Sequence, residues 1–408
     1  MGFPASTQTS GNPSLCYLGR MKKDKPIPRF SPRAEAVTPF LAMEVLERAK
    51  ELEAGGRDVI YLCVGEPDFP TPAAACEAAI RGIRDGEIKY THSLGLPELR
   101  EAIAEHYDRR YGVAVDPGRI IVSCGSSPLM LLLFSALLDE GDEVLLSDPC
   151  YACYPNFIRF PGGRPRFLRT REEDGFQPRP EEVRKAITPR TRGILVNSPS
   201  NPAGSVLPAG WFEELASLPV PLISDEVYHG LTYEGEERSA LEFDPDAFVI
   251  GGFSKTFAMT GWRLGYLIVP RYGVRVLQSL HQNFLISANH FVQQAGIAVL
   301  KGGWGDVETM RAAYDRRRRH LVERLRALGL GVSRMPQGAF YVMADARHIE
   351  PDSLKLAMEI LEATGVALTP GIDFGEGAQG YLRFTYANSI ENIDKAMDRL
   401  QEYFKGRK

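Results

Sequence analysis

The chain has 408 residues, a formal net charge of −4 and 44% hydrophobic residues, which is an ordinary composition for a globular protein. This length leaves room for two domains and a large core. The weak net charge gives no electrostatic basis for binding nucleic acid or an anionic membrane, and no apolar stretch reaches the ~18 residues that a membrane span needs.

The N-terminal segment and the cysteines constrain where the protein works. Residues 1–29 are predicted to be disordered, and their Ser, Thr, Gly and Pro-rich start lacks the basic and apolar regions of a secretory signal. Six cysteines without framework spacing indicate a reducing compartment, so we expect a cytoplasmic protein. The segment Cys150–Cys153 is formally a CxxC, but it has no second pair and no nearby His at zinc spacing, so no metal site is predicted.

Taken in chain order, the apolar patterns predict an α/β protein. A helical stripe over 41–54 stops at a Gly-Gly pair, and a short strand follows at 59–62. Helical stretches then alternate with apolar runs that read as buried strands, at residues 120–123, 143–146, 194–196, 221–223 and 247–250. This βα alternation predicts a large domain with a mostly parallel sheet that has helices on both faces.

The C-terminal third has a different pattern. A long, mostly helical region is predicted from about 271 to 328. It is followed by a strand near 339–343, a helix near 352–364 and a strand at 382–384. These elements indicate a second, smaller α+β domain.

The most informative motif is the segment Gly252–Tyr266. It holds Lys255 between a serine and a Thr-Phe pair, and Arg263 follows eight positions later. A lysine amine can hold an aldehyde cofactor as a Schiff base, and an arginine can fork onto a phosphate. We therefore predict pyridoxal 5′-phosphate (PLP) as the cofactor, with its aldehyde at Lys255 and its phosphate at Arg263.

Two more polar residues stand where apolar runs end. Asn201 follows the run at 194–196, and Asp225 ends the run at 221–223. If both runs are buried parallel strands, these side chains emerge at the carboxyl edge of the sheet, where ligands bind in open α/β folds.

The order Asn201, Asp225, Tyr228, Lys255 and Arg263 resembles that of the class I/II aminotransferases, the fold-type I PLP enzymes of the aspartate aminotransferase superfamily. The resemblance extends from about residue 30 to the C-terminus. It implies the fold-type I arrangement of a large α/β domain and a smaller α+β domain.

The resemblance also implies domain boundaries. Residues 30–64 would pack with the small domain, 65–300 would form the large PLP-binding domain, and 301–408 would form the small one.

The resemblance assigns roles around the cofactor ring. Asp225 would lie against the pyridine nitrogen, where its attraction for a protonated ring is about 4 kcal/mol at ~4 Å and an effective dielectric of ~20. Asn201 and Tyr228 would hydrogen-bond the phenolic oxygen. Lys255 would hold the resting cofactor and then move the proton as a base. Ser254 and Arg263 would bind the phosphate.

Four further residues match the family's cofactor contacts. Ser126 and Ser127 start a helix after a strand, where free N–H groups and the helix dipole favour a phosphate, although many relatives carry other residues after the glycine of this turn. Tyr151 matches the aromatic residue that stacks on the pyridine face. Tyr90 matches a tyrosine that reaches the phosphate of the neighbouring subunit, so the resemblance implies a homodimer.

Substrate contacts follow in the same way. Arg383 matches the arginine that grips the substrate α-carboxylate with a bidentate fork. Gly65 matches the glycine whose backbone approaches that carboxylate, and Asn201 would lie beside it.

The sequence therefore predicts a PLP-dependent aminotransferase that moves an amino group from an L-amino acid to a 2-oxo acid by ping-pong kinetics. Two alternatives stay open: a C–S or β-elimination lyase or related enzyme of the same fold, and a non-catalytic ligand sensor.

Some aspartate-type relatives bind the second carboxylate with a lysine in the phosphate turn, where Ser127 stands here, or with an arginine from the partner's loop, which residues 282–289 lack. We therefore expect a neutral aliphatic or aromatic donor, with 2-oxoglutarate or pyruvate as acceptor.

Overall fold

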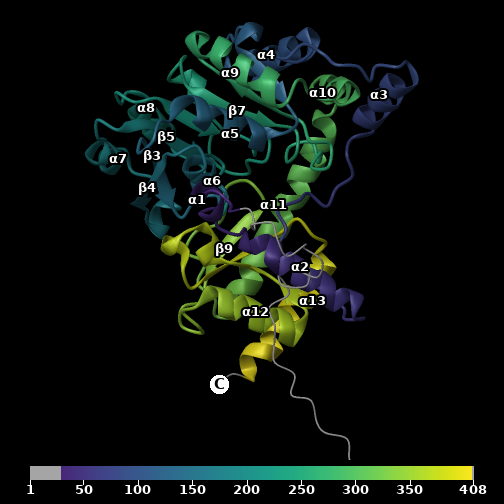
Figure 1. Ribbon diagram of the computed structural model, residues 1–408. Coiled ribbons are helices and arrows are strands. Elements are labelled where there is room, and N and C mark those ends of the chain that lie inside the picture. The colour runs from purple at the N-terminus through teal and green to yellow at the C-terminus, as the bar shows by residue number, and fades with distance from the viewer. Residues whose placement is uncertain (1–28, 407–408) are drawn as a thin grey trace, which may run out of the picture.

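The computed structural model describes residues 29–406 (Figure 1). The predicted disordered segment 1–29 therefore lies outside the described residues, except for its last residue. The chain forms a larger unit around a seven-stranded sheet and a smaller C-terminal unit, with a long helix running between them (Figure 1).

The seven-stranded sheet has the order β2-β8-β7-β6-β5-β3-β4. All neighbouring strands are parallel except β8, which is antiparallel to both β2 and β7. The mostly parallel α/β sheet is thus confirmed. Its strands are β2 (Ile120–Ser123), β3 (Glu143–Asp148), β4 (Arg164–Arg169), β5 (Thr191–Asn197), β6 (Leu222–Asp225), β7 (Phe248–Gly252) and β8 (Gly265–Ile268).

The sequence patterns did not predict β4 or β8. Strand β4 lies at the edge of the sheet and carries Arg164, Arg166 and Arg169, so it lacks the apolar run of a buried strand. Strand β8 has only four residues, and its first two belong to the Lys255 motif. Neither strand gives a strong local signal.

Helices cover both faces of this sheet, as predicted. They are α3 (Ala73–Arg84), α4 (Pro97–Tyr111), α5 (Ser126–Leu137), α6 (Tyr154–Arg159), α7 (Pro180–Ala186), α8 (Ala209–Ala216), α9 (Arg271–Phe284) and α10 (His290–Gly302). Side chains alternate between the two faces along each strand, so β5 sends Ile194 and Val196 into the core under α4, α7, α8 and α10. Leu195 points into the opposite core, under α5, α6 and α9.

The smaller unit is built on a three-stranded antiparallel sheet with the order β11-β12-β9. Its strands are β9 (Tyr341–Asp345), β11 (Thr369–Pro370) and β12 (Tyr381–Thr385). The helices of this part are α11 (Trp304–Ala327), α12 (Ser353–Thr364) and α13 (Ile390–Lys405). Their apolar sides enclose a third core with the sheet.

The N-terminal part of the described chain joins this smaller unit. After the short helix α1 (Pro32–Glu35), helix α2 (Leu41–Ala54) packs against α12, β11 and the short strand β10 (Val366–Ala367). Strand β1 (Ile60–Tyr61) pairs in parallel with β10. These contacts place α2 and β1 against the smaller unit, while the boundaries 30–64, 65–300 and 301–408 stay a prediction. Within residues 29–406, none of the helices combines the length and the apolar character that crossing a membrane requires.

Candidate active site

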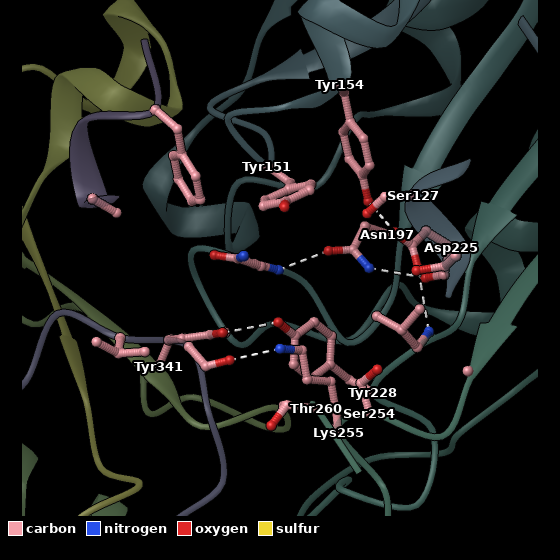
Figure 2. Close-up of a pocket in the computed structure, with 18 of the residues that line it drawn as sticks. Ser127, Tyr151, Tyr154, Asn197, Asp225, Tyr228, Ser254, Lys255, Thr260 and Tyr341 are labelled. Carbon is pink, nitrogen blue, oxygen red and sulfur yellow. Dashed lines mark hydrogen bonds between the residues drawn. The ribbon is translucent and has the colours of Figure 1, made fainter. Parts of the chain in front are cut away.

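A cavity of about 270 Å³ opens where the carboxyl ends of β5, β6 and β7 face the smaller unit (Figure 2). Both units and the start of α2 contribute to it. Eleven of the twelve predicted site residues line this cavity: Gly65, Ser126, Ser127, Tyr151, Asn201, Asp225, Tyr228, Ser254, Lys255, Arg263 and Arg383. The twelfth, Tyr90, is 81% exposed on the surface of its own subunit.

Lys255 lies in the turn after β7, and its amine is directed into the cavity. Its Nζ donates a hydrogen bond to the backbone carbonyl of Gly65 at 2.6 Å. The adjacent Thr256 fixes the turn, because its hydroxyl donates to the carbonyl of His229 at 2.5 Å. Burial lowers the pKa of Lys255 to about 8, against the opposing charge of Glu66. A lower pKa leaves more of the amine neutral and nucleophilic near neutral pH.

Asp225 ends strand β6 and is buried at the opposite side of the cavity from the smaller unit. Its carboxylate accepts a hydrogen bond from the Tyr154 hydroxyl at 2.5 Å and one from the backbone N–H of Val227 at 3.2 Å (Figure 2). Burial raises the pKa of Asp225 to about 6, although both hydrogen bonds oppose this rise. Near neutral pH the group is therefore mostly an anion.

The third part of the cavity is suited to an anion. Helix α5 begins at Ser126, and its N-cap is Gly125, which has no side chain to cap the free N–H groups. Gly125 has a φ of 103°, and a Cβ there would lie 2.7 Å from Nη2 of Arg263. Ser127 and Ser254 complete this end, so hydroxyls, free amides and a guanidinium converge on one place.

Arg383 comes from β12 of the smaller unit and is buried. Its Nη1 donates to Oδ1 of Asn201 at 2.9 Å, and its Nη2 donates to the carbonyl of Cys63 at 2.6 Å and to the hydroxyl of Thr369 at 3.0 Å. Its Nε is buried without a hydrogen-bond partner. Because Arg383 lines the cavity, its guanidinium is placed to receive an anionic group from a substrate.

Two tyrosines shape the rest of the cavity. The Tyr228 hydroxyl lies 2.9 Å from that of Tyr341. Burial raises the pKa of Tyr228 well above its ordinary value, so its hydroxyl keeps its proton. The ring of Tyr151 makes edge contacts with the rings of Phe40, at 6.1 Å, and Tyr154, at 5.2 Å between centroids.

Several residues that line the cavity were absent from the prediction. Phe40 and Met43 come from the start of α2, and no local pattern indicates that this helix reaches the site. Tyr341 is the first residue of β9 and looks like a core tyrosine in sequence. Tyr154 had the clearest available signal, because it lies three residues after Tyr151 in the same segment.

These groups fit PLP by their chemistry. The cavity offers an amine for an aldehyde (Lys255), a carboxylate for a pyridine nitrogen (Asp225) and a cradle for a phosphate at the start of α5. The aromatic ring of Tyr151 is available for the ring of a cofactor. Among residues 29–406, no three His, Cys, Asp or Glu side chains are grouped as ligands for a metal ion.

The comparisons with known proteins agree with this geometry. Residues 57–400 match the family described as aminotransferase class I and II. The chain therefore belongs to this family and is a PLP-dependent aminotransferase.

Particular relatives are similar over nearly their whole length. The chain is 43% identical to an aspartate/prephenate aminotransferase of Thermus thermophilus over 91% of this chain and 97% of the relative. It is 40% identical to a (5-formylfuran-3-yl)methyl phosphate transaminase of Methanocaldococcus jannaschii over 89% and 96%. A solved structure of the Thermus thermophilus aspartate aminotransferase with maleate has a TM-score of 0.89 at 42% identity, covering 92% of this chain and all of that one.

Proposed function

We propose that this aminotransferase uses Lys255 to bind PLP covalently and works by ping-pong kinetics on amino acids with neutral side chains. The observation that carries the proposal is that one cavity joins a buried amine of lowered pKa, a buried carboxylate and a buried arginine. A transaminase needs these groups to hold the cofactor aldehyde, its pyridine ring and the substrate carboxylate.

Each residue then has a physical role. When bound, PLP supplies an electron sink that stabilises negative charge at the substrate Cα. Asp225 keeps a proton on the pyridine nitrogen, since its carboxylate is charged near neutral pH. Arg383 fixes the α-carboxylate and so orients the Cα hydrogen toward Lys255. The amine of Lys255, once free, would act as the base that takes and returns the proton at the substrate Cα.

The preference for a neutral donor follows from the cavity lining. Among the residues that the structure describes, the cationic side chains of the lining are Lys255, Arg263 and Arg383, and each has a role in the proposal. The described residues of one subunit therefore place no further cation in the lining for a second substrate carboxylate. The start of α2 instead presents Phe40 and Met43, which suit an aliphatic or aromatic side chain. 2-Oxoglutarate or pyruvate would be the acceptor.

The test is the visible absorption of the purified holoenzyme as single amino acids are added without an acceptor. Bleaching by leucine-, methionine- or phenylalanine-like donors at lower concentrations than by aspartate supports the proposal. Aspartate as the best donor of a full panel would contradict the neutral class, and would agree with the names of several relatives. Release of pyruvate and ammonia would instead indicate the lyase alternative. An unchanged band with every amino acid would favour the ligand sensor.

The covalent role of Lys255 has a separate test. Borohydride reduction of the holoenzyme, digestion and mass spectrometry should find the cofactor on the peptide that contains Lys255. Lys255→Ala should lose both this adduct and turnover while it keeps its circular dichroism spectrum. An adduct on another lysine, or normal turnover by Lys255→Ala, would refute the assignment.

We also propose a homodimer in which Tyr90 completes the partner's phosphate site. Tyr90 is 81% exposed, and Ile88, Phe284 and Ile286 near it are exposed apolar residues. The hydrogen bond from the Thr91 N–H to the Ser287 hydroxyl, at 3.3 Å, brings these two segments together. A cluster of exposed apolar residues is typical of a protein–protein interface.

Mixed subunits test the shared site. Lys255→Ala and Tyr90→Phe chains, each impaired as homodimers, should regain activity when refolded together, because one of the two sites in each hybrid then has both native residues. If light scattering gives the mass of a dimer but no activity is regained, the proposal that the subunits share active sites is contradicted. A monomeric mass would contradict the dimer itself.

A further inference from the structure

Tyr341 has an unusual place among the cavity residues. It is 1% exposed and comes from β9, in the same small sheet as the strand that carries Arg383. It contacts residues from three distant parts of the chain: Tyr228, Arg383 and Gly65. The proposed function so far gives it no role.

The contact with Tyr228 is a hydrogen bond between two hydroxyl groups, at 2.9 Å, with both rings buried (Figure 2). Each hydroxyl has one proton, so only one of the two can donate in this pair. If Tyr228 donates its proton to the phenolic oxygen of the cofactor, its oxygen must accept the proton of Tyr341. The Tyr341 hydroxyl therefore decides where the Tyr228 proton can point.

The contact with Arg383 acts on the same ring. The guanidinium carbon of Arg383 lies 4.3 Å from the centroid of the Tyr341 ring, which is a cation–π distance. The positive charge of Arg383 opposes the rise that burial causes in the pKa of Tyr341. A nearby cation makes the hydroxyl of a phenol ring a better hydrogen-bond donor, so this contact favours donation from the Tyr341 hydroxyl to Tyr228.

Gly65 fixes the position of the hydroxyl. A Cβ at residue 65 would lie 2.1 Å from the Tyr341 hydroxyl oxygen, so this oxygen rests against the bare Cα of the glycine. The carbonyl of the same residue accepts the hydrogen bond from Lys255. The packing leaves the Tyr341 side chain little freedom to turn away from Tyr228.

We infer that Tyr341 is a positioning residue that donates a hydrogen bond to Tyr228 and so aims the Tyr228 proton at the phenolic oxygen of PLP. Through its ring contact with Arg383, Tyr341 also links Tyr228 to the residue that binds the substrate carboxylate. This inference rests on the proposed function, because it requires PLP on Lys255 with its phenolic oxygen at Tyr228. It adds a hydroxyl relay that runs from Tyr341 through Tyr228.

The relay makes a directional prediction. A hydroxyl whose oxygen accepts a hydrogen bond is a stronger donor. Without Tyr341, Tyr228 donates more weakly, the phenolic oxygen of bound PLP would hold more negative charge, and the Lys255 nitrogen bonded to the cofactor would keep its proton to higher pH. The pH midpoint of the visible absorption band should therefore rise in Tyr341→Phe. We expect a rise of about 0.3–1 unit, since a neutral hydrogen bond is worth about 0.5–1.5 kcal/mol.

Tyr341→Phe keeps the ring beneath Arg383 and removes only the hydroxyl. The charged groups that act on the Lys255 nitrogen all remain in place: Asp225 from β6, Arg263 and Arg383, with Glu66 close by. Tyr386→Phe is the matched control. Tyr386 is equally buried in the smaller unit, but its hydroxyl donates to the carbonyl of Gly338 at 3.2 Å and it does not line the cavity.

The experiment is a spectrophotometric pH titration of five holoenzymes: the native protein, Tyr341→Phe, Tyr228→Phe, the double variant of these two, and the control Tyr386→Phe. The inference expects a rise in Tyr341→Phe, a larger rise in Tyr228→Phe, no further change in the double variant, and the native midpoint in Tyr386→Phe. Independent, additive shifts would overturn the relay, because Tyr341 would then act without Tyr228. An unchanged midpoint in Tyr341→Phe would also overturn it.

Failure of the proposed function is distinguishable from failure of the inference. If the native protein reconstituted with PLP has no visible band that titrates, the assignment of Lys255 fails. If the band titrates but Tyr228→Phe leaves its midpoint unchanged, Tyr228 does not contact the phenolic oxygen and the relay is refuted while the aminotransferase assignment stands.

Discussion

The buried amine of Lys255 should make the protein without cofactor less stable near neutral pH than a variant without this amine. Burial lowers the pKa of Lys255 from 10.5 to about 8. Each pKa unit corresponds to about 1.36 kcal/mol, so the protonated amine lowers the free energy of unfolding by about 3 kcal/mol at pH ~7. In Lys255→Met this penalty is absent. Loss of the hydrogen bond to the Gly65 carbonyl offsets about 1 kcal/mol of the resulting gain in the free energy of unfolding.

The sign depends on pH in a defined way. The folded-state pKa lies below the unfolded one, so the contribution of Lys255 to stability is fully present above pH 10.5 and is lost as the pH falls through about 8. Lys255→Met should therefore be more stable than the native apoprotein by about 2 kcal/mol at pH ~7. The difference should fall to about zero near pH ~10, because the remaining penalty of about 0.8 kcal/mol is then offset by the lost hydrogen bond.

The assay is urea unfolding of the two apoproteins, followed by circular dichroism at both pH values with the m-value held in common. Lys301→Met, at an exposed lysine of α10, is the control and should show no such dependence on pH. A Lys255→Met protein that is less stable than the native apoprotein at neutral pH would refute the reasoning. A gain of the same size at both pH values would also refute it, since removing the buried charge would then not be its cause.

Three other perturbations test the site. Asp225→Asn should lower kcat/KM by roughly 10²–10³-fold, because the attraction of about 4 kcal/mol for the pyridine proton is lost, while the apoprotein stays folded. Steady-state kinetics measure the activity and circular dichroism measures the fold. Native-like turnover would contradict the role of Asp225 at the pyridine nitrogen. Asp373→Ala should lower the free energy of unfolding by about 1 kcal/mol and raise KM for an apolar donor. The reason is that the Asp373 carboxylate accepts hydrogen bonds from the first two N–H groups of α2, at 2.9 and 3.1 Å. An unchanged KM would show that this helix cap does not affect the cavity. Gly65→Ala should lower turnover about tenfold or more, since the added methyl group would collide with the Tyr341 hydroxyl; a fully active variant would show that this oxygen can move away.

The sequence alone was enough to identify the family and the central chemical groups. Lys255 and Arg263 lie in one short segment, so their proximity follows from chain connectivity. Asn201 and Asp225 follow apolar runs that had to be parallel strands, and the carboxyl ends of parallel strands meet at one edge of a sheet. These inferences use local patterns and one topological rule, which is why they needed no coordinates. The roles of these residues stay predictions until they are tested.

Tertiary structure alone decided which side chains complete the cavity. The hydrogen bond between Tyr154 and Asp225 joins residues 71 positions apart, and that between Tyr228 and Tyr341 joins residues 113 positions apart. The carboxylate of Asp373 caps α2 from 332 positions away and so holds that helix at the cavity. Such contacts leave no periodic signal in the sequence, because they depend on how separately formed elements pack against one another. This packing depends on the shape and burial of whole helix and sheet faces, and a local sequence pattern does not contain that information.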